Sequence, residues 1–437
     1  MLKANPGDGK GTPRHQERCL PTVKLLRPTY SDKFRCIGAL CEDNCCSGNW
    51  AVTVDQASYE KYKSMTDSPL FPILEAAVIP LPEESPLKKP SVFAIIETNA
   101  SGFCPLFSDE GLCRLQLEHG FDALCTTCKV FPRSPLMIDS WPETALSLSC
   151  PEAARLILLD PDLAIPPVDC KQFPWDDTAD PSPELRSYFW HIREFIVKLI
   201  RNRSYPLWQR MFLLGTFSRR LDAMAHGQLD RGFPAFLRDF SAAIADGSLR
   251  ATMETIAPDL ALQLDMIVSL VNLCLTTPEL ARHMPPRLQK TLQAFGQGIG
   301  DHTGATPASK IAKYKQAWEN YANPFFQKHP HFLENYLLNQ IYRNLFPFGK
   351  DLFFPQAVPA PASAYSRLAT HYALIKTILI GVAGFHKETF TTEIAVEAVE
   401  SVYRYFEHNI TFLDNAHELL VKRQLNNARG LTMLLRN

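Results

Sequence analysis

The residues with the clearest capacity for chemistry are the cysteines near the N-terminus. The segment "CIGALCEDNCCSGNW", residues 36–50, has the spacing C-x4-C-x3-C-C. After Cys46, 57 residues intervene before a second group with the spacing C-x8-C-x11-C-x2-C. The eight cysteines of these groups are Cys36, Cys41, Cys45, Cys46, Cys104, Cys113, Cys125 and Cys128. Thiolates are strong ligands for Zn²⁺ and for iron–sulfur clusters, and short loops let several sulfurs reach one centre. We therefore predict that these cysteines bind metal and that the two groups meet in space.

Redox disulfides and inert buried thiols are the alternatives to a metal site. The N-terminal segment "MLKANPGDGKGTPRHQERCLP" has no apolar core of the kind that a secretory signal requires. We therefore expect a cytoplasmic protein, and structural disulfides are rare in that compartment. The spacing does not separate zinc from iron, because the same cysteines suit two Cys₄ zinc sites or one [4Fe–4S] cluster with ligands to spare. The run "CEDNCC" lacks the third cysteine of the motif found in radical enzymes that cleave S-adenosylmethionine.

A further thiol and a polar stripe are the other candidate site residues. In "SLSCPEAARL", Pro151 suits the first position of a helix, which places Cys150 at the N-cap, where backbone N–H groups favour a thiolate. Cys150 is then a further metal ligand, a reactive thiol or simply the start of a helix. In the predicted helix "HFLENYLLNQIYRNLF", Asn335, Asn339 and Arg343 lie four residues apart on one stripe. This stripe either holds a polar substrate or cofactor, or is a solvated face.

Composition limits the partners and the class of protein. The chain has 437 residues, of which 46% are hydrophobic and 21% charged, with a formal net charge of −1. It can bury a large core in two or three domains, and it has no overall field that would hold nucleic acid or an anionic membrane. The apolar run "ALIKTILIGVAGF" carries Lys376 and is shorter than the roughly 20 residues that span a bilayer. We interpret it as a buried helix and expect no membrane partner.

The elements that position these residues are mainly helical. Residues 69–91 contain six prolines, so the cysteine-rich part is expected to be irregular, and "SVFAIIE" reads as a short strand within it. Six more prolines between residues 161 and 183 indicate a linker. Beyond the linker, apolar residues recur at intervals of three and four, which predicts an all-α domain. The only glycine-rich candidate for a cofactor loop, "FGQGIGD", follows a predicted helix rather than a strand, so we predict a turn there.

Several segments together resemble the flagellin lysine-N-methylase family. They are "FRCIGALCEDNCCSGNWAVTVDQASYEKY", "GLCRLQLEHGFDALCTTCKVFPR", "ALSLSCPEAARLIL", "FLENYLLNQIYRNLFPFG" and "RYFEHN", and they extend in family order from about residue 28 to about residue 410. The resemblance implies a cytoplasmic enzyme that carries an iron–sulfur cluster, a [4Fe–4S] cluster in our interpretation. It also implies that the enzyme uses S-adenosylmethionine to methylate lysines of flagellin.

We therefore predict a mainly α protein of two parts. The predicted segments are a mobile leader at 1–27, a cysteine-rich metal module with little sheet at 28–160, a proline-rich linker at 161–183 and an α-helical domain at 184–437. The predicted function is S-adenosylmethionine-dependent N-methylation of protein lysines, with flagellin as substrate. The alternative is a scaffold without catalytic activity, in which zinc only stabilises the fold of an interaction domain.

Overall fold

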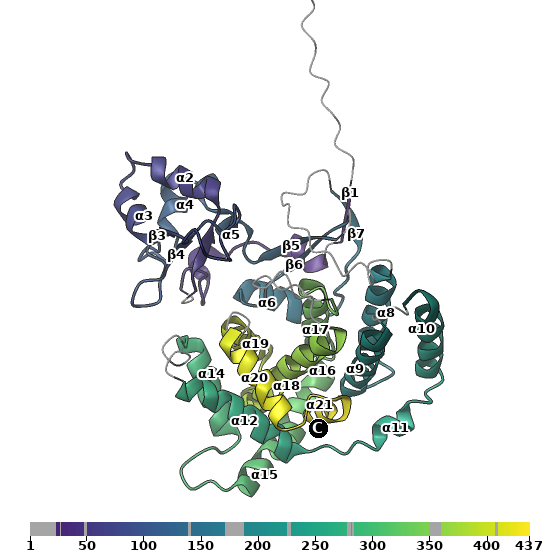
Figure 1. The fold of residues 1–437 in the computed structure, drawn as a ribbon. Helices are drawn as coiled ribbons and strands as arrows, with labels where there is room; N and C mark the ends of the chain where they lie inside the picture. Colours follow the sequence, from purple (N-terminus) through teal and green to yellow (C-terminus); the bar gives the residue numbers. More distant parts are fainter. Residues whose placement is uncertain are drawn as a thin grey trace, which may run out of the picture.

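The computed structural model shows a mainly helical chain with two small sheets, which confirms the predicted fold class (Figure 1). The predicted leader, apart from residues 23–26, lies outside the described residues, as does most of the predicted linker. The described residues are 23–26, 28–47, 50–138, 141–170, 188–224, 229–277, 281, 284–348, 360–406 and 410–437.

The cysteine-rich module is built around a three-stranded antiparallel sheet with the strand order β2-β4-β3. Strand β4 falls within the predicted strand "SVFAIIE" and confirms it. A small core that includes Val54, Leu74 and Ile96 also takes up Cys104 and Cys125. The elements are η1 (Gly38–Leu40), β2 (Val52–Val54), α2 (Gln56–Ser64), α3 (Phe71–Ala77), β3 (Val78–Pro80), β4 (Ala94–Ile96), α4 (Arg114–His119), η2 (Phe121–Ala123) and α5 (Thr126–Val130).

A second sheet joins the N-terminal part of the chain to the helices. Its four strands have the order β5-β6-β1-β7, and β1 pairs parallel with β6 while the other pairs are antiparallel. Leu146 at the end of β6 and Leu148 just after it are buried in the same large core as the helices, together with Tyr30. Thus the chain after the second cysteine group packs with the helical body. The elements are β1 (Val23–Leu26), α1 (Thr29–Lys33), β5 (Arg133–Ile138), β6 (Trp141–Leu146), α6 (Pro151–Leu158) and β7 (Pro167–Cys170).

The rest of the described chain forms the helical body, and the cysteine-rich module lies at one end of it (Figure 1). Most of its helices are amphipathic and contribute one face to a single core. They are α8 (Phe189–Arg201), α9 (Leu207–Met224), α10 (Leu229–Ala245), α11 (Arg250–Glu254), α12 (Leu260–Thr276), α14 (Pro286–Gly298), α15 (Pro307–Ala317), the π-helix η3 (Trp318–Ala322), α16 (Asn323–Lys328), α17 (His331–Arg343), α18 (Pro361–His386), η4 (Lys387–Thr389), α19 (Thr392–Phe406), α20 (Ile410–Lys422) and α21 (Ala428–Leu435).

Helix α18 runs through the middle of the helical body. Its 26 residues make it long and apolar enough to cross a membrane, so the expectation that this segment is too short is wrong. Most of the helix is buried inside the protein, as predicted, because α9, α14, α15, α19 and α21 pack around it. Lys376 is buried too, and its Nζ donates a hydrogen bond to the carbonyl oxygen of Leu435 at 2.5 Å, at the C-terminal end of α21.

The closest approach to α18 is made by α14 through glycines. Gly296 and Gly298 of the segment "FGQGIGD" form the last turn of α14, and the turn that we predicted begins only after them. A Cβ on Gly298 would lie 1.7 Å from the carbonyl oxygen of Gly381, so only glycine fits at this contact. These glycines therefore serve helix packing.

We expect Gly298→Ala to destabilise the helical body by on the order of 1–3 kcal/mol, because the added methyl group meets backbone that cannot turn away. Gly232→Ala is the matched control, since Gly232 lies in helix α10 and a Cβ there meets nothing within 4 Å. The control is expected to be neutral or to stabilise by up to ~1 kcal/mol. Urea unfolding followed by far-ultraviolet circular dichroism measures both, and equal midpoints would contradict this packing.

Candidate functional site

The first cysteine group lies on a tightly bonded turn. Gly38 has a φ of +57°, which favours glycine, and its carbonyl oxygen accepts the N–H of Cys41 at 3.0 Å. The side chain of Asn44 then organises the next residues, because its Oδ1 accepts the N–H of Cys46 at 2.8 Å. Its Nδ2 donates to the carbonyl oxygen of Gly111 at 2.9 Å, next to the second cysteine group. The Asn44 side chain therefore joins the first cysteine group to the backbone beside the second.

The thiols of the two groups come close to one another. The Cys104 N–H donates to the carbonyl oxygen of Cys46 at 2.7 Å, and the Cys46 thiol forms hydrogen bonds with the thiols of both Cys45 and Cys104. Cys125 and Cys128 form a second hydrogen-bonded pair at the start of α5. Electrostatic interactions then connect Cys128 with Cys45 and Cys113. We call the eight predicted cysteines of this region the thiol cluster.

Two cysteines outside the thiol cluster, Cys150 and Cys274, differ in how they relate to it. Cys150 is the N-cap of α6, as predicted, and its thiol interacts electrostatically with those of Cys41 and Cys45. The ten cysteines whose side chains the structure describes are all free. The one that stands apart is Cys274 in α12, where burial alone raises the pKa of the thiol to about 12.

The protonation of the thiol cluster is uneven. The hydrogen bond from Cys46 lowers the pKa of the Cys45 thiol to about 7, and the charge of Arg404 acts in the same direction. The Cys46 thiol itself has a raised pKa, first because it donates toward Cys104 and Cys45. Burial raises the pKa of Cys41 to about 11. Cys45 is thus the thiol closest to the anionic form that metals and electrophiles require.

The residues of the thiol cluster fit a metal in the chemistry of their donor atoms. Cysteine sulfur suits both zinc and iron–sulfur clusters, and several thiols are near each other. No group of three or more histidine, cysteine, aspartate or glutamate side chains is arranged to hold a metal ion, within the residues that the structure describes. Two sets of these side chains are hydrogen-bonded to one another instead, Cys46 with Cys45 and Cys104, and Cys125 with Cys128.

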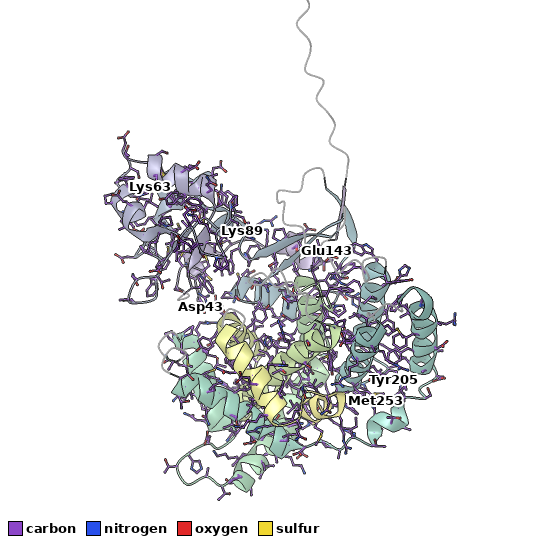
Figure 2. The ribbon with its side chains drawn as sticks, in the orientation of Figure 1. Asp43, Lys63, Lys89, Glu143, Tyr205 and Met253 are labelled. Carbon is purple, nitrogen blue, oxygen red and sulfur yellow. The ribbon has the colours of Figure 1, made fainter. Side chains whose placement is uncertain are left out.

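Residues 41–47, which we call the cysteine turn, contact the helical body through α19. Both terminal nitrogens of Arg404 donate to the turn, to the carbonyl oxygens of Asp43 at 2.8 Å and Asn44 at 2.7 Å. The Arg404 guanidinium also lies 3.2 Å from the Asp43 carboxylate and 4.5 Å from the centre of the Trp50 ring. Figure 2 shows Asp43 where the module meets the helices.

A second arginine and a second carboxylate complete the contact. The Nε of Arg287 on α14 lies 3.7 Å from the Asp43 carboxylate and 3.3 Å from that of Glu400 on α19. Burial and the neighbouring Asp43 charge raise the pKa of Glu400 to about 8.

Sequence reasoning missed Asp43, Arg287 and Glu400 as a group. The available signal was the pair of charges four residues apart, Glu400 and Arg404, within an otherwise apolar stretch of helix.

The predicted polar stripe of α17 faces the interior. Asn335 is 2% exposed, and its Nδ2 donates to the carbonyl oxygens of Ile157 at 2.9 Å and Asp160 at 2.6 Å. These bonds attach α17 to the C-terminal end of α6. The alternative of a solvated face is therefore wrong for this residue.

Asn339 and Arg343 continue the same stripe. Asn339 is 1% exposed, donates to the carbonyl oxygen of Leu146 at 3.1 Å and accepts the hydroxyl of Tyr30 at 2.6 Å. Arg343 is half-buried and donates to the hydroxyl of Tyr403 at 3.3 Å. The structure thus uses the stripe as a set of internal attachments, and a role in binding substrate or cofactor stays a prediction.

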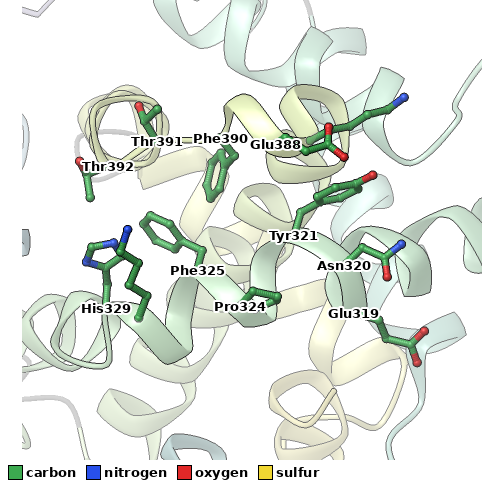
Figure 3. Close-up of a pocket in the computed structure, with 12 residues that line it drawn as sticks. Glu319, Asn320, Tyr321, Pro324, Phe325, His329, Glu388, Phe390, Thr391 and Thr392 are labelled. Carbon is green, nitrogen blue, oxygen red and sulfur yellow. The ribbon is translucent and has the colours of Figure 1, made fainter.

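A hollow in the described part of the structure lies elsewhere, between η3, α16 and the N-terminal end of α19 (Figure 3). Its volume is about 900 Å³. The rings of Phe325 and Phe390 lie in its middle, with His329 on one side and Tyr321 on the other. It contains no cysteine and no residue of the predicted stripe. It is separated from the thiol cluster by most of the length of α19.

The fold and the site define a helical protein with an N-terminal thiol cluster attached by buried charges. Residues 193–434, more than half of the chain, match the family model described as the FliB lysine N-methylase C-terminal domain. The chain therefore belongs to the FliB lysine N-methylase family, which confirms the resemblance seen in the sequence.

Comparison with individual relatives extends the similarity beyond residues 193–434 to most of the chain. The chain is 25% identical over 412 residues to a lysine-N-methylase of Salmonella typhimurium, covering 90% of this chain and 94% of the relative. It is 33% identical over 144 residues to the flagellar biosynthetic protein FliU of Salmonella muenchen, covering 32% of this chain and 80% of that protein. No solved structure matches the chain.

We expect Asn339→Leu to lower the free energy of unfolding by about 3 kcal/mol, because the buried Leu146 carbonyl loses the amide donor of Asn339 and the buried Tyr30 hydroxyl loses its acceptor. Asn320→Leu on η3 is the control, since Asn320 is exposed and should change stability by no more than about 0.5 kcal/mol. Urea unfolding of both variants gives the comparison. A stable Asn339→Leu protein would show that these bonds are not structural.

Proposed function

We propose that this chain transfers methyl groups from S-adenosylmethionine to the ε-amino groups of lysines on flagellin. The family match over residues 193–434 carries the proposal. The printed names of the relatives, a lysine-N-methylase and a flagellar biosynthetic protein, support the lysine and the flagellar substrate. The reaction takes place in the cytoplasm, and neither nucleic acid nor a membrane has a part in it.

The chemistry sets requirements for the site. A lysine amine has a reference pKa of about 10.4, and it must lose a proton before its lone pair can form the new N–C bond. The S–CH₃ bond of S-adenosylmethionine breaks as that bond forms in a polar transfer, and S-adenosylhomocysteine leaves. A site that excludes water favours the neutral amine, since desolvation disfavours the ammonium.

We further propose that the thiol cluster holds a [4Fe–4S] cluster, with zinc as the alternative metal. The ligands would come from the eight predicted cysteines, and Cys150 would be an additional thiol at the edge of the helical body. The support is the donor chemistry and the proximity of the thiols. An iron–sulfur cluster supplies a redox-active centre when bound, whereas zinc in a Cys₄ site supplies stability.

The test is anaerobic purification of the full chain, with analysis of iron, sulfide and zinc, followed by an assay with S-adenosylmethionine labelled in the methyl group. We expect iron and sulfide in equal amounts and label in lysines of purified flagellin. A chain that contains only zinc, does not bind S-adenosylmethionine and leaves flagellin unlabelled would overturn the proposal in favour of a zinc-stabilised scaffold.

We expect Cys45→Ser to strip the metal from the anaerobically purified chain, because Cys45 is hydrogen-bonded to Cys46 and interacts electrostatically with Cys128 of the second group. It should also destabilise the cysteine-rich module, since metal binding and folding are coupled in such modules. Cys274→Ser is the matched control: it removes one thiol from α12, outside the thiol cluster, and should keep full metal content. Metal analysis of the two variants decides the point, and equal metal contents would exclude Cys45 as a ligand.

A further inference from the structure

The contact between the cysteine turn and α19 buries an unusual amount of charge. Arg404 is 3% exposed, Glu400 is 0% exposed and Asp43 is 8% exposed. Burying a charge is costly unless partners compensate, and removing one partner leaves the others uncompensated. The position of the turn therefore depends on all members of this group being in place.

Arg404 is the member that contacts the backbone of the turn. Its planar guanidinium donates to two consecutive carbonyl oxygens, those of Asp43 and Asn44, which only a forked donor can reach together. The carbonyl oxygen of the next residue, Cys45, accepts the Nε1 of Trp50 at 3.2 Å, and the Trp50 ring covers the guanidinium. Three successive carbonyl groups leading to Cys45 and Cys46 are thus fixed by Arg404 and Trp50.

We propose that Arg404 is a positioning residue that fixes the turn carrying Cys45 and Cys46 on α19, so that the thiol cluster keeps one geometry relative to the helical body. The expected effect of Arg404 on methylation rests on the proposed function, whereas its effect on the position of the turn does not. Arg404 donates to the backbone of the turn and pairs with the Asp43 carboxylate, so it acts on the thiols through their placement, in addition to its charge, which lowers the pKa of the Cys45 thiol.

A neighbouring ion pair provides a control within the same loop. Arg155 on α6 pairs with Glu42 at 2.5 Å, directly before Asp43 in the chain. Both side chains are about one-third exposed, so solvent screens this pair and it contributes little. If any charge pair on this loop were enough to hold it, Arg155 and Arg404 would have equal effects.

The experiment is hydrogen–deuterium exchange of the full chain for the wild type, Arg404→Gln, Arg404→Lys and Arg155→Gln. We expect exchange at residues 41–47 to be about tenfold faster in Arg404→Gln, because the turn opens locally while both cores stay folded. Strand β4 and helix α18 report those two cores and should keep wild-type protection. Arg404→Lys keeps the charge but cannot donate to both carbonyl groups, so its exchange should be intermediate. Arg155→Gln should stay within about twofold of wild type.

Each other outcome overturns the proposal. Unchanged exchange at residues 41–47 in Arg404→Gln would show that the turn holds without Arg404, and an equally large effect of Arg155→Gln would show that the contact is not specific. Loss of protection in β4 and α18 in both Arg404 variants would show that Arg404 is needed for the stability of the whole fold.

The methylation assay is a separate arm, in which Arg404→Gln should lower kcat about 100-fold with KM for flagellin unchanged. If wild type does not methylate flagellin, the proposed function fails, and the exchange data still decide the role of Arg404.

Discussion

The helical body depends on one constraint: α18 is apolar almost all round and must be covered on every side. Its neighbours meet this constraint in different ways. Helix α14 comes close through Gly298 and Gly381, and α21 ends where its last carbonyl groups can accept the buried Lys376. Tyr314 of α15 forms a hydrogen bond with Thr377 at 3.4 Å, so a polar residue of α18 is also paired. The arrangement of the surrounding helices follows from covering this one.

Because helix α19 packs on α18, the need to cover α18 also fixes where α19 presents its charged residues to the cysteine turn. One of its faces packs on α18 within the large core, where Val399 and Val402 are buried. Its other face carries Glu400 and Arg404 toward α14 and the cysteine turn. The helix cannot rotate to expose these charges without exposing its apolar face, so packing fixes where the guanidinium points. The thiol cluster is therefore placed by residues that share no sequence motif with the cysteines.

The sequence predicted features that depend on local pattern. These include the helical class, the helix of residues 331–343, the strand around residue 95, Cys150 at a helix start and the grouping of the cysteines. It did not predict the four-stranded sheet, because β1 and β7 lie in segments that read as leader and linker and pair only across long sequence distances. The Asn335 and Asn339 stripe was assigned correctly to one face, but periodicity alone cannot tell a buried polar face from a binding face. The buried charges were missed since Asp43 and Arg404 are 361 residues apart.

The two hydrophobic cores contain no residue in common, so the module and the helical body do not share a core. What joins the cysteine turn to the body is polar: Arg404 and Arg287 on Asp43, and Arg155 on Glu42. Interfaces of this kind resemble transient contacts more than the interior of a domain, so the position of the turn on the body depends on these few charged residues. The charges at the base of the turn therefore hold the backbone that carries Cys45 and Cys46, without help from a shared hydrophobic core.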